Sequence, residues 1–175
     1  GSNLKSLIKY SKLKKPRFNV KLVITNKKEA KGLIYAKKNK IENIIVNYKN
    51  KSKAEKKILF FLKKKKINVI CLAGFMKILS DKFIKEFKGK ILNTHPSLLP
   101  KYKGLNTHQR AINNKEKYSG FTIHLVSKKL DSGKKIFQKK IKISKKDNVK
   151  TLEKKILKLE NKYYPVILSK FLINL

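Results

Sequence analysis

The sequence predicts an α/β fold, a Rossmann-like, mostly parallel sheet with helices on both faces. Segments of helical periodicity alternate with short β-branched segments, as in folds whose parallel strands are joined by helices. Residues 69–73 (VICLA) are wholly apolar, which is typical of a strand buried on both faces. The chain has 175 residues, of which 41% are hydrophobic, and this suits one domain with a sizeable core. We therefore expect a single domain over residues 1–175.

Helices are predicted where apolar residues recur every three or four positions, as Leu4, Leu7 and Ile8 do behind the capping candidates Ser2 and Asn3. The third predicted helix ends in four lysines, which suit a helix C-terminus. The last contains a proline, where we expect a bend. The predicted helices are residues 4–14, 29–38, 54–65, 81–87 and 149–172.

Strands are predicted where β-branched and other apolar residues form short runs. These runs are residues 18–25, 44–46, 69–73, 91–93, 121–126 and 136–143. In open α/β sheets ligands bind at the carboxyl ends of the strands. Polar residues that directly follow a predicted strand are therefore the first candidates for a functional site.

The charge is extreme, with 47 Lys+Arg against 10 Asp+Glu and a formal net charge of +37. A basic excess of this size is common in nucleic-acid-binding proteins. However, only Arg17 and Arg110 are arginines, the residue that base and phosphate recognition favours, and the lysines spread along the whole chain. We interpret the lysines as a solvated surface and expect no specific nucleic-acid partner.

Membrane association and secretion are also disfavoured. No stretch approaches eighteen consecutive apolar residues, and Cys71 is the single cysteine, which excludes an intramolecular disulfide framework. We expect a cytoplasmic protein with no membrane partner.

Three short polar segments are candidates for chemistry. Asn93-Thr94-His95 follows an apolar strand, residues 130–133 (LDSG) follow another, and residues 1–3 open the first helix, where free amides favour anions. Each also has an ordinary structural interpretation as a loop, a turn or a cap. No second His or Cys lies at ligand spacing around His95, so no metal is expected. Ser97 lacks the G-x-S-x-G context of a serine hydrolase.

Three consecutive motifs carry a resemblance: LAGFMKIL at 72–79, ILNTHPSLLP at 91–100 and KYKGLNTH at 101–108. Together they resemble the phosphoribosylglycinamide formyltransferases, a branch of the folate-dependent formyltransferases. Methionyl-tRNA formyltransferases usually have Gly-Ala-Ala-Pro in place of the GLNTH run. Formyltetrahydrofolate deformylases usually have a second His in place of Pro96.

The resemblance implies transfer of a formyl group from 10-formyltetrahydrofolate to the amine of glycinamide ribonucleotide in purine biosynthesis, without a metal. The catalytic Asn, His and Asp of the family match Asn93, His95 and Asp131. In such a reaction Asn93 and protonated His95 would donate hydrogen bonds to the oxyanion, and His95 would assist proton movement. Asp131 would hold a charge or an ordered water molecule beside His95.

The family's substrate-binding residues match Gly1, Ser2 and Asn3, which would cradle the nucleotide phosphate, and Glu160, which would accept hydrogen bonds from the glycinamide. The expected folate-binding residues are Lys51, Met76, Lys77, Ile78, Leu79, Asn93, Ser127, Lys128, Lys129, Leu130 and Asp131. The apolar ones among them would also fit an ordinary core. For His108 and His124, ligand contact and a purely structural role both remain open.

The family begins with an apolar strand that runs into the phosphate loop, whereas this sequence starts at that loop. The resemblance therefore predicts an N-terminally truncated domain in which the strands near Leu22 and Ile91 each lack a neighbour. Two other functions stay open, a deformylase that uses water in place of the amine and a non-catalytic basic nucleic-acid-binding protein. We expect a monomer or a weak dimer.

Overall fold

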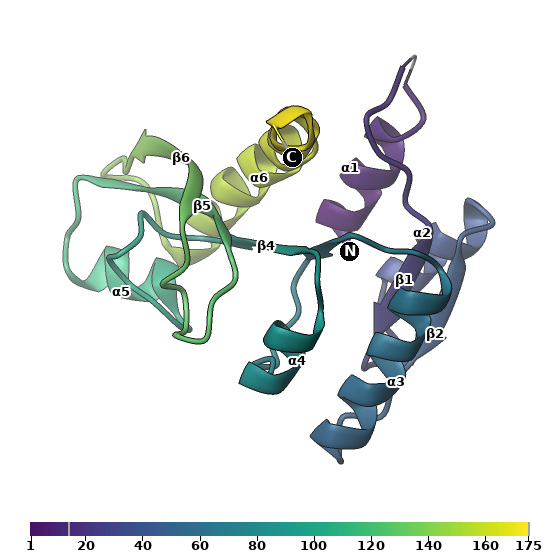
Figure 1. The fold of residues 1–175 in the computed structure, drawn as a ribbon. Helices are drawn as coiled ribbons and strands as arrows, with labels where there is room; N and C mark the ends of the chain where they lie inside the picture. The colour runs from purple at the N-terminus through teal and green to yellow at the C-terminus, as the bar shows by residue number, and fades with distance from the viewer. Residues whose placement is uncertain (14, 175) are drawn as a thin grey trace.

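The computed structural model describes residues 1–13 and 15–174 (Figure 1). The helices are α1 (Ser2–Tyr10), α2 (Gly32–Lys38), α3 (Lys51–Lys64), α4 (Asp81–Glu86), α5 (Thr107–Asn113) and α6 (Val149–Phe171), followed by the 3-10 turn η1 (Leu172–Asn174). The strands are β1 (Leu22–Thr25), β2 (Glu42–Ile45), β3 (Val69–Leu72), β4 (Lys90–His95), β5 (Tyr118–Leu125) and β6 (Lys135–Lys142).

Among the described residues the strands form two hydrogen-bonded sheets. In one, β1 pairs with β2 in parallel; the other has the order β3-β4-β5-β6. In the second sheet β3 and β4 are parallel, while β5 and β6 each run antiparallel to their preceding neighbour. The strands predicted at 121–126 and 136–143 thus form a hairpin at one side of the sheet.

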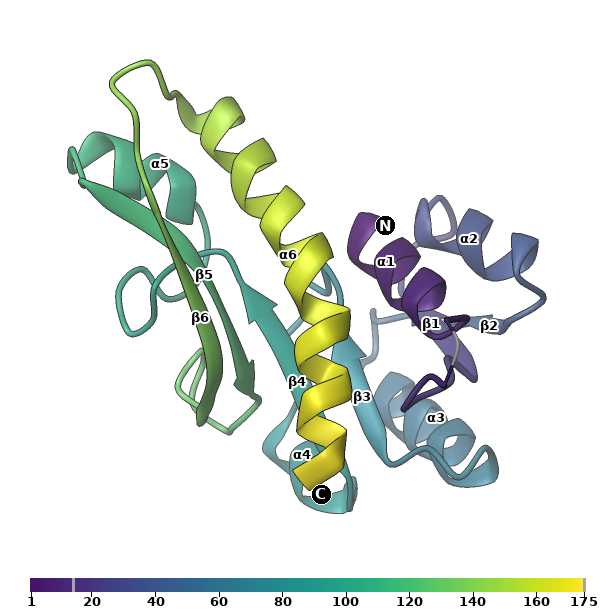
Figure 2. The same ribbon diagram turned by 90° about the horizontal axis from the view of Figure 1, so that it is seen from above.

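Helices cover both faces of the sheet, as predicted. One hydrophobic cluster joins Leu92 of β4 to Leu7 of α1 and to Ile156 of α6. A second cluster joins the next residue back along β4, Ile91, to α3 and α4. Because neighbouring strand residues point to opposite faces, β4 is packed on both sides. Figure 2 shows α6 crossing the sheet in front of β4, with α1 beside it.

The first helix differs from the prediction at its N-terminus. It begins at Ser2 with Gly1 as its N-cap, and Ser2 and Asn3 lie in the first turn instead of capping it. The side chain of Asn3 is directed to α6 instead. The predicted end of this helix at Lys14 lies outside the described residues. At the other terminus, α6 continues through Pro165.

Two expectations about the sheet were wrong. The predicted strand at 91–93 has neighbours on both sides, because β4 pairs with β3 and with β5. Among the described residues, β1, β2, β3 and β6 each have one edge without a strand partner. Of these strands, β1 and β3 lie in different sheets although Ile24 and Ile70 pack in one cluster. All four residues of β3 are half-buried, not buried on both faces, which is consistent with its free edge.

Among the described residues, no helix combines the length and the apolar character that a membrane span requires.

Candidate active site

The carboxyl end of β4 places three polar residues on alternate faces of the sheet. Asn93 and His95 share the face of Ile91, and Thr94 shares the face of Leu92, because side chains alternate along a strand. The pleat therefore divides the predicted Asn-Thr-His segment between two clusters, one on each side of β4.

The first cluster contains His95 and Asp131. Asp131 comes from the loop after β5, and its Oδ2 lies 3.4 Å from Nδ1 of His95. Both side chains are 7% exposed. The same carboxylate oxygen accepts the backbone N–H of Gly104 at 2.9 Å, and the backbone of Asp131 is left-handed with φ 46°. Such conformations cost free energy in non-glycine residues and occur often at functional sites.

Both ring nitrogens of His95 face protein oxygen atoms. Nε2 lies 2.9 Å from the carbonyl oxygen of Tyr102, and Nδ1 faces Asp131. A carbonyl can only accept, so Nε2 carries a proton. Nδ1 is thus left facing the carboxylate of Asp131. The expected hydrogen bond from His95 to the oxyanion stays a prediction, and the geometry shows that the ring is held between Tyr102 and Asp131.

His124 lies opposite Asn93 on the neighbouring strand. Its Nδ1 is 2.9 Å from the carbonyl oxygen of Leu125, so Nδ1 donates and Nε2 is left to accept from Nδ2 of Asn93 at 3.3 Å. Asp131 Oδ1 lies 3.6 Å from the same Nε2. Burial lowers the pKa of His124, an effect that outweighs the opposing effect of Asp131. His124 is therefore a neutral acceptor that orients the Asn93 amide.

A cavity of about 240 Å³ opens beside this cluster. Its lining includes nine of the residues expected to contact folate, namely Met76, Lys77, Ile78, Leu79, Asn93, Ser127, Lys128, Leu130 and Asp131. Gly104, Leu105 and His124 also line it. His95 lies outside the lining and is 6% exposed.

Apolar side chains at the cavity are unusually exposed. Met76 is 68% exposed, Ile78 62% and Leu105 65%. Apolar surface next to a few placed polar groups is typical of a site for an organic ligand. Lys51 and Lys129 are outside the lining; Lys51 is the first residue of α3, and Lys129 is exposed.

Two residues near the cavity, Glu55 and Gly133, fix the loops that form it. The Glu55 carboxylate on α3 accepts both the backbone N–H and the hydroxyl of Ser80, so it holds the end of the segment that contains Met76 and Leu79. A Cβ atom at Gly133 would lie 1.7 Å from the carbonyl oxygen of Leu125, so only glycine fits where the Asp131 loop turns back.

The second cluster lies on the opposite face of β4. Glu160 of α6 accepts from Nδ2 of Asn3 at 3.1 Å and from the Thr94 hydroxyl at 3.0 Å. Burial raises the pKa of Glu160, more than these two hydrogen bonds lower it. The structure therefore brings together Asn3 and Glu160, which are 157 positions apart in the sequence. Thr94 belongs to the candidate segment Asn93-Thr94-His95, but the resemblance assigned no role to it.

His108 and a bound metal ion are the remaining possibilities raised by the sequence. His108 lies in α5, outside the cavity lining, and burial lowers its pKa. Over the part of the chain that the structure describes, no group of three or more His, Cys, Asp or Glu residues could hold a metal ion.

Comparison with known proteins identifies the family. The formyl transferase family matches residues 1–168. The chain belongs to the formyl transferase family. It is 37% identical over 174 residues to the phosphoribosylglycinamide formyltransferase of Haemophilus influenzae, covering 98% of this chain and 82% of that protein. It is 36% identical over 172 residues to the human trifunctional purine biosynthetic protein adenosine-3, covering 97% of this chain but 17% of that protein.

Solved structures give the same result for this formyl transferase. The crystal structure of phosphoribosylglycinamide formyltransferase from Anaplasma phagocytophilum superposes with a TM-score of 0.93 at 34% identity, covering 99% of this chain and 82% of that one. The corresponding structure from Brucella melitensis gives 0.92 at 38% identity, covering 98% and 90%. The α/β fold and the family are thus established independently of the site geometry.

Proposed function

We propose that this formyl transferase moves the formyl group of 10-formyltetrahydrofolate to the amine of glycinamide ribonucleotide, a step of purine biosynthesis. The observation that carries the proposal is the wall of the cavity, where Asn93 and Asp131 lie side by side with His95 buried behind Asp131. The printed name of similar proteins, phosphoribosylglycinamide formyltransferase, supports the formyl acceptor.

The proposed chemistry uses the first cluster. The amine nitrogen of the substrate forms a bond to the formyl carbon, and the carbonyl oxygen becomes an oxyanion. Asn93 donates one N–H to His124, so its second N–H can donate to this oxygen. The His95–Asp131 pair accepts the proton that the amine loses. That proton is then returned to the folate nitrogen as its bond to the formyl carbon breaks.

Substrate binding uses both faces of β4. We assign the folate to the cavity, with its pterin against the backbone of residues 76–79 and 127–131, and the glutamate tail toward Lys51. We assign the phosphate of the nucleotide to Gly1, Ser2 and Asn3, and the glycinamide amine to Glu160. The contact between Asn3 and Glu160 supports one continuous nucleotide site.

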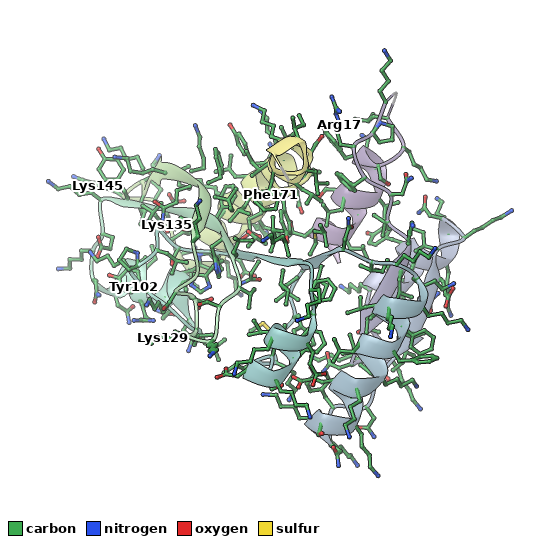
Figure 3. The ribbon with its side chains drawn as sticks, in the orientation of Figure 1. Arg17, Tyr102, Lys129, Lys135, Lys145 and Phe171 are labelled. Atoms are coloured by element: carbon green, nitrogen blue, oxygen red, sulfur yellow. The ribbon has the colours of Figure 1, made fainter. Side chains whose placement is uncertain are left out.

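The proposal includes residues 1–175 as one formyltransferase domain that acts in the cytoplasm and needs no metal. Apart from Lys51 and the lysines at the folate cavity, the basic side chains play no specific part in it. Figure 3 shows Lys129, Lys135 and Lys145 on the side of β5 and β6 and Arg17 on the other side of α6, so the basic side chains are not confined to one groove. This distribution favours a solvated surface over a nucleic-acid groove.

The experiment that tests the function is product identification. The purified protein is incubated with 10-formyltetrahydrofolate and glycinamide ribonucleotide, and the nucleotide product is analysed by mass spectrometry. We expect the N-formylated nucleotide. Formate as the main product would instead support a deformylase, and an unchanged folate would contradict both activities.

A further inference from the structure

One short loop contacts both members of the His95–Asp131 pair. The carbonyl oxygen of Tyr102 lies 2.9 Å from Nε2 of His95, and the backbone N–H of Gly104 donates to Oδ2 of Asp131 at 2.9 Å. These two groups are two residues apart in the chain, whereas His95 and Asp131 come from different strand ends. The position of this loop therefore sets the separation between His95 and Asp131.

The backbone of this loop has an unfavourable conformation. Tyr102 and Asn106 are left-handed with φ 58° and 57°, and Gly104 has φ 78°. Glycine adopts this region freely, but tyrosine does so at a cost in free energy, so other contacts must hold it there.

The Tyr102 side chain supplies these contacts on the outside of the domain. Its hydroxyl donates to Oε1 of Glu116 at 2.5 Å and accepts from Nδ2 of Asn114 at 2.8 Å. The Arg110 guanidinium lies 4.9 Å from the centre of its ring. Hydrogen bonds from Lys101 and Tyr102 lower the pKa of Glu116, so this carboxylate is ionised at neutral pH and remains an acceptor.

The loop is also fastened along its length. The Arg110 guanidinium donates to the carbonyl oxygen of Lys103 at 2.8 Å, and Nζ of Lys103 donates to the Ser132 hydroxyl at 2.6 Å. Ser132 follows Asp131 directly, so the loop holds the Asp131 segment by a side-chain contact as well.

We propose that Tyr102 is a positioning residue for catalysis. Its side chain, held by Glu116, Asn114 and Arg110, fixes the backbone carbonyl that orients the His95 ring toward Asp131. Its effect on turnover rests on the proposed function, because it acts through His95 and Asp131.

The test is Tyr102→Phe, which keeps the ring and removes the hydroxyl. We expect kcat to fall about tenfold, with the KM of both substrates within about twofold, since misplacing a reacting group lowers kcat while binding elsewhere is kept. Tyr118→Phe is the matched control. Tyr118 is 46% exposed and its ring is contacted by Lys140 on the surface, so this variant should retain the wild-type kcat.

A double-mutant cycle tests the pathway. Glu116→Ala should lower kcat in the same way, and combining it with Tyr102→Phe should add little, because both remove one shared contact. If Tyr102→Phe does not fold, Glu116→Ala alone carries the test. Additive losses, or an unchanged kcat in the variant that is measured, would contradict the proposal.

Nitrogen-15 NMR of the His95 ring gives a readout that a merely structural role would not move. We expect the Nε2 resonance to shift in Tyr102→Phe and to stay in place in Tyr118→Phe. This measurement needs no turnover, so it distinguishes failure of the positioning role from failure of the proposed function. An unshifted His95 resonance overturns the positioning role even if formyl transfer is observed.

Discussion

The Asn93 amide and the His124 ring meet across the antiparallel pair β4 and β5, with Nδ2 3.3 Å from Nε2. Nδ1 of His124 donates to the Leu125 carbonyl oxygen, so Nε2 carries no proton and can only accept. The Asn93 amide must therefore point an N–H group toward Nε2. This contact directs the Asn93 oxygen away from His124 and leaves an N–H group at the wall of the cavity. The orientation depends on His124 remaining neutral.

Acidification should therefore destabilise the protein through His124. Burial lowers its pKa below the ordinary 6.5, so the unfolded chain binds more protons and the free energy of unfolding falls as pH falls through 6.5. His124→Gln should make this dependence weaker. Urea unfolding at a series of pH values measures it, and His108→Gln gives the separate contribution of the half-buried His108, whose pKa is also lowered by burial. Equal pH dependence in wild type and His124→Gln would contradict the neutral role.

Removing the His95 ring should affect turnover and spare folate binding. We expect His95→Ala to lower kcat by about 10²-fold or more, a typical loss for a general acid or base. The KM for the folate should change little, because His95 lies outside the cavity lining. Steady-state kinetics with both substrates measures the two effects. Turnover close to wild type would remove His95 from the mechanism.

Replacing Glu160 should have opposite effects on binding and stability. In Glu160→Gln the amide can still accept from Asn3 and donate to Thr94, but the charge that would meet the substrate amine is lost. We expect the KM for glycinamide ribonucleotide to rise about tenfold, a typical loss for a charge-assisted hydrogen bond.

The stability effect of this variant depends on pH. Burial raises the pKa of Glu160 above the ordinary 4.5, so the stability present below pH 4.5 is lost as pH rises, and glutamine avoids this loss. The Tm difference between Glu160→Gln and wild type should thus increase with pH. Glu153→Gln, on the exposed side of α6, should change neither KM nor Tm. A Tm difference that is constant with pH would contradict the buried-charge account.

The free edges of β1 and β3 predict that an added strand stabilises the domain. Unpaired strand edges expose backbone groups, and a central strand buries several apolar side chains worth about 1.5–3 kcal/mol each. An apolar extension of about ten residues ahead of Gly1 should raise Tm and tighten nucleotide binding together. An extension of the same length with polar residues is the control, and an equal Tm for both would contradict this prediction.

Local patterns in the sequence predicted most of the elements, because apolar periodicity is a local signal. Most of the residues that line the cavity were instead expected from the family resemblance. Helix α5 was missed, since its segment THQRAIN has little apolar periodicity and buries only Thr107 and Ala111 among its residues. The predicted strand at 18–25 is shorter in the structure, where it spans Leu22–Thr25. Its length depends on pairing with β2, which a local sequence pattern does not show.

The contacts that hold the site could not be read from local patterns. Thr94 meets Glu160, and His124 meets Asn93, only through the pleat of β4 and the register of an antiparallel pair. Tyr102 acts through its backbone carbonyl, which no side-chain motif reveals.

The central claim is that the acceptor of the formyl group is an amine held in this site, and not water. The most direct measurement is the rate of tetrahydrofolate release by one preparation with and without glycinamide ribonucleotide. We predict a rate that depends on the nucleotide, saturates with it and falls by about 10²-fold in His95→Ala. Release at the same rate without the nucleotide would contradict the account and identify water as the acceptor.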